Sequence, residues 1–149
     1  MKVAIDTNVL VYAEGVSGAH KGETARLLMD RLKTDAVVPV QVLAEFFNVL
    51  TLKARIPASE ARGLTGQLAG FYQTVPTTDG VLAEATALAD LHRLKIFDAI
   101  ILSAAAEAGC GLLLSEDMQD GFVYRGVTVA NPFAETPHPL LASLLETLP

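Results

Sequence analysis

Short apolar runs alternate along the chain with longer stretches in which apolar residues recur three and four positions apart. The short runs predict buried strands at residues 3–5, 36–39, 74–76, 112–114 and 127–130. The longer stretches predict helices over residues 20–33, 42–50, 61–71, 79–92 and 98–108. Thr78 or Asp79 fits a helix N-cap, and Gly109 fits a left-handed helix end. The order along the chain is therefore strand, helix, strand, repeatedly.

This alternation predicts an α/β fold, because parallel neighbouring strands need crossover connections and helices supply them. We expect a central, mostly parallel five-stranded sheet flanked by helices on both faces, which explains strands that are apolar throughout. A length of 149 residues fits a single domain over residues 1–149. Residues 137–149 predict a tail helix whose leucines either pack on the domain's own core or dock another chain. These leucines are Leu140, Leu141, Leu144, Leu145 and Leu148.

Composition and charge narrow the class of protein. With 51% hydrophobic residues, 19% charged residues and a single cysteine, Cys110, the chain is neither disordered nor a disulfide scaffold, and it fits a reducing compartment. Because 17 acidic residues outnumber 11 basic ones, for a net charge of −6, no global basic field attracts nucleic acid. No apolar run reaches the roughly 20 residues that span a bilayer, so we expect a cytoplasmic protein without a membrane segment.

Four carboxylates stand where strands end or helices begin, although they are far apart in the sequence: Asp6, Glu45, Asp98 and Asp117. In an open α/β sheet, ligands bind outside the carboxyl ends of the strands, which is where Asp6 and Asp117 would project. Each acid also has a purely structural interpretation. Asp6 fits a turn former, Glu45 a solvent-exposed helix face and Asp98 an N-cap. Their convergence nevertheless favours a shared site.

Four anions in one place repel one another, and each would have a raised pKa unless a cation compensated. Oxygen ligands favour Mg²⁺ or Mn²⁺, whereas His20, His92 and His138 lack the mutual spacing of zinc ligands. Such a site suits phosphoryl transfer, because the metal activates a water and neutralises the charge that grows on the phosphate. The residues thus predict metal-dependent hydrolysis of a phosphodiester.

The same residues resemble the PIN-domain family, and in particular the VapC-type toxin ribonucleases of toxin–antitoxin modules. The resemblance rests on Ile5-Asp6-Thr7-Asn8, on Glu45 within residues 42–46, on Asp98-Ala99 and on residues 114–121. Asn131-Pro132-Phe133 also resembles the end of the family's last strand. The final loop departs from the family pattern, because Ser115 stands in place of a common Thr and Gln119-Asp120-Gly121 follow the last acid. Asp120 therefore either supplements the metal site or forms a turn.

The resemblance implies a metal-dependent endoribonuclease that is usually dimeric and is inhibited by a small antitoxin protein covering the site. The catalytic residues it implies are Asp6, Glu45, Asp98 and Asp117. All of these except Glu45 would hold Mg²⁺ or Mn²⁺, and Glu45 would be a nearby ligand or orient the water. Asn8 and Ser115 would fix the carboxylates by hydrogen bonds.

Substrate contacts and alternative functions complete the hypothesis. Basic residues that follow the helix of Glu45 or precede Asp98 would hold RNA phosphates, and their alternative role is to keep the surface soluble. They are Lys53, Arg55, Arg93 and Lys95. Tyr12 either stacks a base or packs within its helix.

A haloacid-dehalogenase-like phosphatase also places an Asp after its first strand, but it needs a second Asp where this chain has Asn8. A non-catalytic PIN-like module that binds nucleic acid is disfavoured by the retention of all four acids.

Overall fold

The computed structural model describes residues 1–147, which fold around a six-stranded sheet in the order β3-β2-β1-β4-β6-β5. The strands are β1 (Val3–Ile5), β2 (Ala36–Pro39), β3 (Gln73–Val75), β4 (Leu112–Leu114), β5 (Val123–Tyr124) and β6 (Val127–Ala130). Neighbouring strands are parallel except β5 and β6, which are antiparallel. The predicted mostly parallel α/β sheet is confirmed, but the predicted number of five strands is one too few.

The strand that the sequence pattern missed is β5, which forms a hairpin with β6. Val123 pairs with Thr128 and Tyr124 with Val127, so Arg125 and Gly126 form the turn, with φ of 46° and 83°. A two-residue hairpin turn with positive φ at both positions matches the right-handed twist of its strands. Two residues are too few for an alternating pattern to stand out, which explains why no strand was predicted here.

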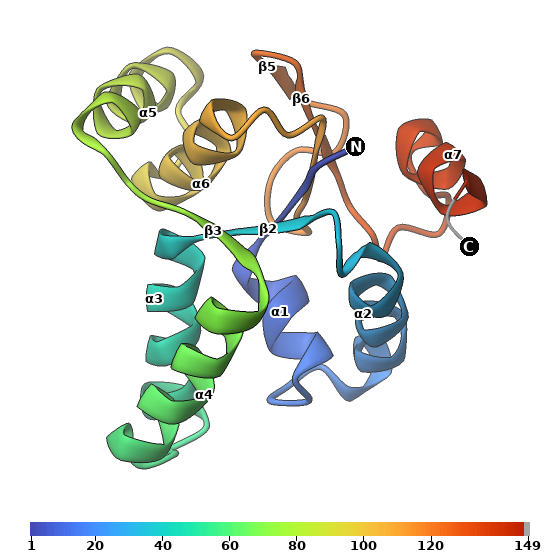
Figure 1. The fold of residues 1–149 in the computed structure, drawn as a ribbon. Coiled ribbons are helices and arrows are strands. Elements are labelled where there is room, and N and C mark those ends of the chain that lie inside the picture. The colour runs from blue at the N-terminus through green and yellow to red at the C-terminus, as the bar shows by residue number, and fades with distance from the viewer. Residues whose placement is uncertain (148–149) are drawn as a thin grey trace.

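Helices cover both faces of the sheet, as expected. They are α1 (Thr7–Ala13), α2 (Ala19–Leu32), α3 (Val40–Asn48), η1 (Val49–Lys53), α4 (Ala58–Phe71), α5 (Asp79–His92), α6 (Ile96–Glu107) and α7 (Pro139–Thr147), and η1 is a π-helix. Figure 1 shows α5 and α6 on one side of the strands and α1 to α4 on the other. The chain runs from β1 outward to β2 and β3, and then returns to β4 on the other side of β1. Because crossovers between parallel strands are right-handed, the reversal places the later helices on the opposite face of the sheet.

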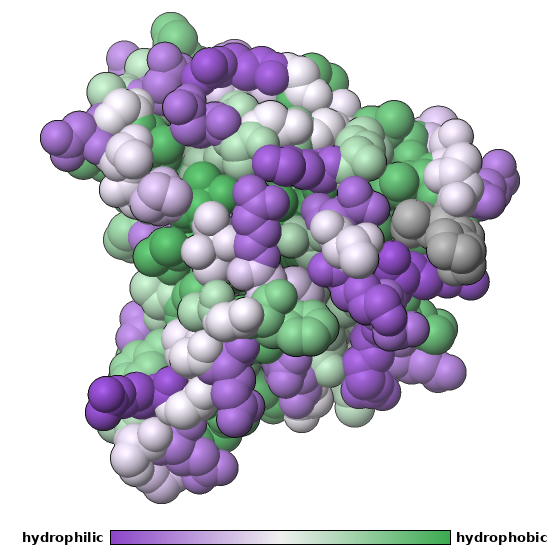
Figure 2. All heavy atoms as spheres, in the orientation of Figure 1, coloured by the Kyte–Doolittle hydropathy of each residue, from purple (hydrophilic) through white to green (hydrophobic). Residues whose placement is uncertain are grey.

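The core lies between the central strands and these helices. Every residue of β1, β2 and β4 is buried, because helices cover both sides of these strands. Phe46, Leu10 and Ile101 are among the largest fully buried side chains, and each such burial stabilises the fold by roughly 1.5–3 kcal/mol. Figure 2 shows that hydrophobic residues also reach the surface among hydrophilic ones. The core therefore fixes the strand ends at which the acids stand.

The ends of two helices test the predicted caps. Thr78 is the N-cap of α5, where its hydroxyl accepts a hydrogen bond from the Val81 N–H at 3.1 Å. Gly109 follows α6 with φ of 71°, as predicted for a left-handed helix end. The interpretation of Asp98 as an N-cap is wrong, because α6 begins at Ile96 with Lys95 as its N-cap residue. Asp98 lies within the first turn of α6, so its carboxylate does not serve as that helix's N-cap.

Helix α7 packs part of the leucine seam against the rest of the chain. Leu141 and Leu144 are buried, and Leu140 and Leu145 are partly buried against the core. Leu148, the last leucine of the predicted seam, lies outside the described residues. The seam therefore contributes to the domain's own core through its buried positions. None of the helices that the structure describes has the length and apolarity needed to cross a bilayer.

Candidate active site

Asp6 follows β1 directly and is the N-cap of α1. One carboxylate oxygen accepts a hydrogen bond from the Thr7 N–H at 2.7 Å, and the other accepts one from the Ser115 hydroxyl at 2.6 Å. The side chain of Asp6 is buried, with 4% exposed. One oxygen of Asp6 thus bonds to neighbouring backbone, as the structural interpretation predicted. The other oxygen joins the end of β1 to the loop after β4.

Glu45 reaches the same place from α3. The Thr7 hydroxyl donates to one carboxylate oxygen of Glu45 at 2.7 Å, and the Gln41 amide donates to the other at 3.1 Å. Thr7 is itself buried, at 6% exposed, and lies in the first position of α1. The interpretation of Glu45 as part of a solvent-exposed face is therefore wrong, because α1 and α3 meet at this half-buried carboxylate.

Asp117 lies in the loop after β4, opposite the start of α1. The Asn8 amide donates to Asp117 Oδ2 at 2.6 Å. Ser115 Oγ, which donates to Asp6, also accepts the Met118 N–H at 3.3 Å. Asn8 and Ser115 thus each donate to one of the predicted acids, and together they tie this loop to the ends of β1 and α1.

Two of the four acids have raised pKa values. Burial raises the pKa of Asp6 from 3.8 to about 6. The hydrogen bonds from Ser115 and Thr7 lower this pKa, and the charges of Asp98 and Glu45 raise it. Burial also raises the pKa of Asp98, to which Glu45 and Asp117 contribute, whereas Lys95 lowers it. Charge effects thus link Asp6 with Asp98 and Glu45, and Asp98 also with Glu45 and Asp117, so Asp98 interacts with each of the other three acids.

The chemistry of these donors fits a hard divalent cation. Carboxylate oxygens are the ligands that Mg²⁺ and Mn²⁺ prefer, and a cation would offset the burial and repulsion that raise the pKa values of Asp6 and Asp98. Within residues 1–147, no three His, Cys, Asp or Glu side chains are arranged to hold one metal ion. Several carboxylate oxygens instead accept hydrogen bonds from protein groups. Coordination would require these side chains to turn toward a common point.

The predicted RNA contacts differ in how close they lie to the acids. Lys95 lies near enough to lower the pKa of Asp98. Lys53 comes eight residues after Glu45 along α3 and η1, or about 12 Å at a rise of 1.5 Å per residue, and Arg55 follows it. Arg93 is the C-cap residue of α5. All four basic side chains are exposed, and none forms an ion pair within the described chain.

Sequence reasoning missed residues that support the site from one side. Lys21 Nζ lies 2.6 Å from one oxygen of Glu116, and the Tyr12 hydroxyl donates to the other. Tyr12 also packs edge to face against Phe133, with ring centroids 5.4 Å apart, so its packing partner lies outside its own helix. Lys21 and Glu116 are 95 positions apart, and no sequence pattern connects them.

Asp120, whose role the sequence left open, binds backbone. Its Oδ1 accepts the Asn131 N–H at 2.7 Å, and Asn131 in turn accepts the Phe133 N–H at 2.9 Å. This carboxylate therefore joins the final loop to the end of β6, a connection between two segments that neither alternative predicted.

Comparison with known proteins places this geometry in a family. Residues 3–120 match the model of the PIN domain. The chain belongs to the PIN domain family. Membership agrees with the acids at the ends of β1 and β4, and it replaces the haloacid-dehalogenase-like alternative. No protein with curated annotation is significantly similar to this PIN domain in sequence.

Solved structures share the fold of this PIN domain at low sequence identity. A toxin–antitoxin complex from Klebsiella pneumoniae is 17% identical with a TM-score of 0.67, over 89% of this chain and 98% of that chain. The sarcin–ricin-loop-cleaving toxin VapC20 of Mycobacterium tuberculosis is 15% identical with a TM-score of 0.63, over 75% and 87%. DNA-bound VapBC from Salmonella typhimurium is 13% identical with a TM-score of 0.65, over 87% and 96%.

Proposed function

We propose that this PIN domain is a Mg²⁺- or Mn²⁺-dependent endoribonuclease and the toxin of a type II toxin–antitoxin module. The observation that carries the proposal is the cluster of Asp6, Glu45, Asp98 and Asp117, which four separate parts of the chain contribute. Similarity of fold to toxin–antitoxin complexes and to a toxin that cleaves the sarcin–ricin loop supports it. Such a nuclease would act on RNA in the cytoplasm.

Each acid has a role that follows from its surroundings. Asp6, Asp98 and Asp117 would hold the metal, which when bound lowers the pKa of a water and offsets charge on the phosphate. Glu45 has both oxygens oriented by hydrogen bonds from Thr7 and Gln41, so it is suited to orient the attacking water and accept its proton. The water oxygen bonds to phosphorus as the bond to the leaving oxygen breaks, and that oxygen takes up a proton.

Binding of RNA to an acidic protein must be local. The net charge of −6 repels a polyanion at long range, so attraction depends on the metal and on exposed basic side chains near the acids. Lys95 lies beside Asp98, and Arg93 is two positions earlier. We propose that these two contact phosphates flanking the scissile bond, and that Lys53 and Arg55 bind a more distant part of the strand.

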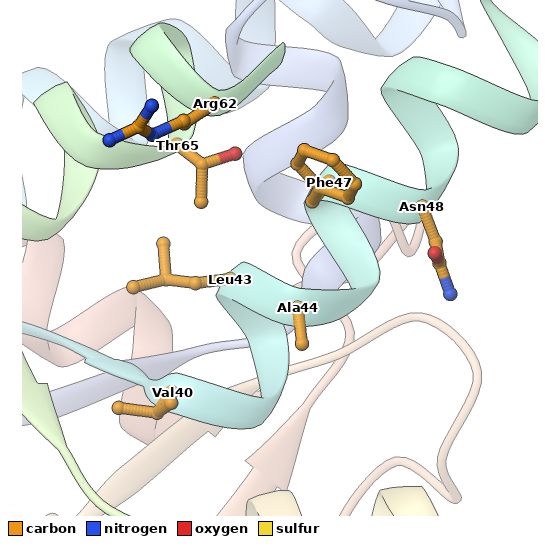
Figure 3. Close-up of a pocket in the computed structure, with 7 residues that line it drawn as sticks. All are labelled: Val40, Leu43, Ala44, Phe47, Asn48, Arg62 and Thr65. Atoms are coloured by element: carbon orange, nitrogen blue, oxygen red, sulfur yellow. The ribbon is translucent and has the colours of Figure 1, made fainter. Parts of the chain in front are cut away.

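An apolar groove on the helix that carries Glu45 provides a surface for the antitoxin. The groove encloses about 490 Å³ between α3 and α4, and Leu43, Phe47 and Thr65 line it (Figure 3). The Thr65 hydroxyl is buried without a hydrogen-bond partner among residues 1–147. Because structures of similar fold are toxin–antitoxin complexes, we propose that an apolar antitoxin segment fills the groove and pairs with this hydroxyl. An Arg or Lys of the same segment would reach the acids and compete with metal.

Cleavage assays test the nuclease. Purified protein should cleave RNA with Mg²⁺ or Mn²⁺, stop when chelator is added, and lose cleavage on Asp98→Asn. Asp90→Asn, which changes an exposed acid of α5, is the matched control and should retain activity. Metal-loaded, folded protein that cleaves no RNA would favour the non-catalytic nucleic-acid-binding alternative.

Growth and binding assays test the toxin and its partner. Expression of the chain alone should arrest growth, and co-expression of a neighbouring small antitoxin gene should restore it. Leu43→Glu places a charge in the apolar groove and should weaken antitoxin binding, while Leu52→Glu, at an exposed leucine of η1, serves as control. Equal antitoxin affinity for Leu43→Glu and wild type would exclude the groove. Sedimentation would test the homodimer that the family resemblance implies.

A further inference from the structure

Helix α1 holds two consecutive residues of the loop after β4 with two side chains of its own. Asn8 and Tyr12 are four positions apart, so they lie on the same face of α1 about one turn from each other. Asn8 donates to Asp117 at 2.6 Å, and the Tyr12 hydroxyl donates to Glu116. Neighbouring side chains of the loop are thus attached to neighbouring turns of one helix.

Lys21 of α2 completes the attachment of Glu116. Its ammonium lies 2.6 Å from the second carboxylate oxygen of Glu116. The same ammonium lies 5.4 Å from the ring centroids of both Tyr12 and Phe133, within the range of a cation–π contact. Glu116 therefore has both oxygens engaged, and the ammonium that engages the second one also lies within cation–π range of two aromatic rings.

This ion pair differs from the other side-chain pairs on the molecule. The side chains of Lys21 and Glu116 are 30% and 13% exposed, whereas those of Lys33 and Asp30 are 58% and 81% exposed and 3.9 Å apart. Pairs as exposed as the latter contribute little to stability. The Lys21–Glu116 pair is shorter, more buried and joins segments 95 positions apart, so it restrains the loop rather than merely solubilising a surface.

We propose that Tyr12 and Lys21 are positioning residues that fix Asp117 by holding Glu116. The inference rests on the proposed nuclease function. Because Glu116 and Asp117 are consecutive, anchoring one side chain limits rotation of the backbone that carries the other. Ser115, bonded to Asp6, and the Met118 N–H, bonded to Ser115, hold the two ends of the same segment. Loss of the Glu116 anchor would remove one of the two side-chain links between this segment and α1 and leave the link from Asn8 to Asp117.

A different role for Lys21 would leave a different kinetic signature. Lys21 also borders a cavity of about 320 Å³ that is lined by His20, Thr24 and Phe133 among others. If Lys21 contacted RNA there, its loss would raise KM for RNA and leave metal affinity unchanged. If Lys21 is a positioning residue, its loss instead lowers kcat and metal affinity, because a misplaced Asp117 weakens metal binding rather than RNA binding.

The experiment measures Mn²⁺ affinity by calorimetry and RNA cleavage kinetics for Lys21→Met, Tyr12→Phe and Glu116→Gln. We expect Mn²⁺ affinity and kcat to fall about tenfold or more in Lys21→Met and Glu116→Gln, which is typical for loss of groups that orient metal ligands, with KM within about twofold. Lys21→Arg should restore most of both. Lys33→Met, which removes the exposed pair, is the matched control and should match wild type.

A double variant tests whether Tyr12 acts through Glu116. Tyr12→Phe combined with Glu116→Gln should be no worse than Glu116→Gln alone, because both changes break the same link. Unchanged Mn²⁺ affinity and kcat in Lys21→Met and Tyr12→Phe, with or without a lower melting temperature, would overturn the proposal. Raised KM alone would overturn it in favour of an RNA contact. If wild type binds Mn²⁺ but cleaves no RNA, the proposed function fails, and the Mn²⁺ affinities still decide the positioning role.

Discussion

Replacing Asp6 by asparagine should stabilise the metal-free protein at neutral pH. Asp6 is 4% exposed, and burial is the main cause that raises its pKa from 3.8 to about 6. This rise corresponds to about 3 kcal/mol in favour of the protonated form, so above pH 6 the fold contains a buried anion that it disfavours. The asparagine side chain would carry no charge and would keep an oxygen for the Thr7 N–H.

The pH dependence of this effect has a definite sign. Folded Asp6 binds its proton more tightly than the unfolded chain does, so the destabilisation is complete above pH 6 and disappears below about pH 3.8. The advantage of Asp6→Asn should therefore be about 1–3 kcal/mol at pH 7.5 and should approach zero at pH 4. We expect less than the full 3 kcal/mol, because the Ser115 hydroxyl must turn to accept from the new amide.

Urea unfolding of chelator-treated protein at pH 7.5 and pH 4 measures both values. In thermal unfolding, each kcal/mol of added stability corresponds to a rise of about 2–4 °C in melting temperature for a domain of this size. Saturating Mn²⁺ should reverse the order of stability, because wild type binds the ion and the variant loses a ligand. Asp90→Asn, which changes an exposed residue, should leave stability at both pH values and the effect of Mn²⁺ as in wild type. A variant that is less stable than wild type at pH 7.5, or an advantage that persists at pH 4, would refute the reasoning.

Three further variants separate chemistry from stability. Glu45→Gln should lower kcat about 100-fold or more while calorimetry shows wild-type Mn²⁺ affinity, if Glu45 orients water; weakened affinity would make it a ligand. Thr78→Ala should lower the free energy of unfolding by about 1 kcal/mol, through loss of the α5 cap, and equal kcat to wild type would confirm that the cap is remote from the site. Leu141→Ala should lower the free energy of unfolding by about 2–5 kcal/mol, measured in denaturant, without changing antitoxin affinity. Weaker binding to the antitoxin would give α7 a docking role.

Predictions from the sequence succeeded where a signal was local. Val3–Ile5 and Leu112–Leu114 are short, wholly apolar and followed by acids, so these strands and the placement of Asp6 and Asp117 directly after them could be inferred. Parallel topology follows from the alternation with helices and needs no knowledge of contacts. The family resemblance used the same residues, and the match of the PIN domain model over residues 3–120 confirms it.

The sequence was uninformative where a contact depends on tertiary packing. Glu45 looks like an exposed position until α1 is placed against α3 and Thr7 donates to it. Asp98 has the residue type of an N-cap, but α6 begins two residues earlier, at Ile96, directly after the extended backbone of Lys95. The pairing of Lys21 with Glu116 joins two charged positions that each look like ordinary solvent-exposed residues. Such side-chain geometry is set by the folded core rather than by any periodicity.

The central place of β1 in the sheet makes the timing of protein synthesis relevant to the proposed activity. The hydrogen bonds from Ser115 to Asp6 and from Asn8 to Asp117 each span 109 positions. At about 5–20 residues per second, Asp6 waits roughly 5–20 s on the ribosome for its partner to be made. A nascent chain that ends before β4 lacks this strand and Asp117, and therefore cannot assemble all four acids. The order of strands thus delays assembly of the acid cluster, and with it the proposed nuclease activity, until most of the chain has been translated.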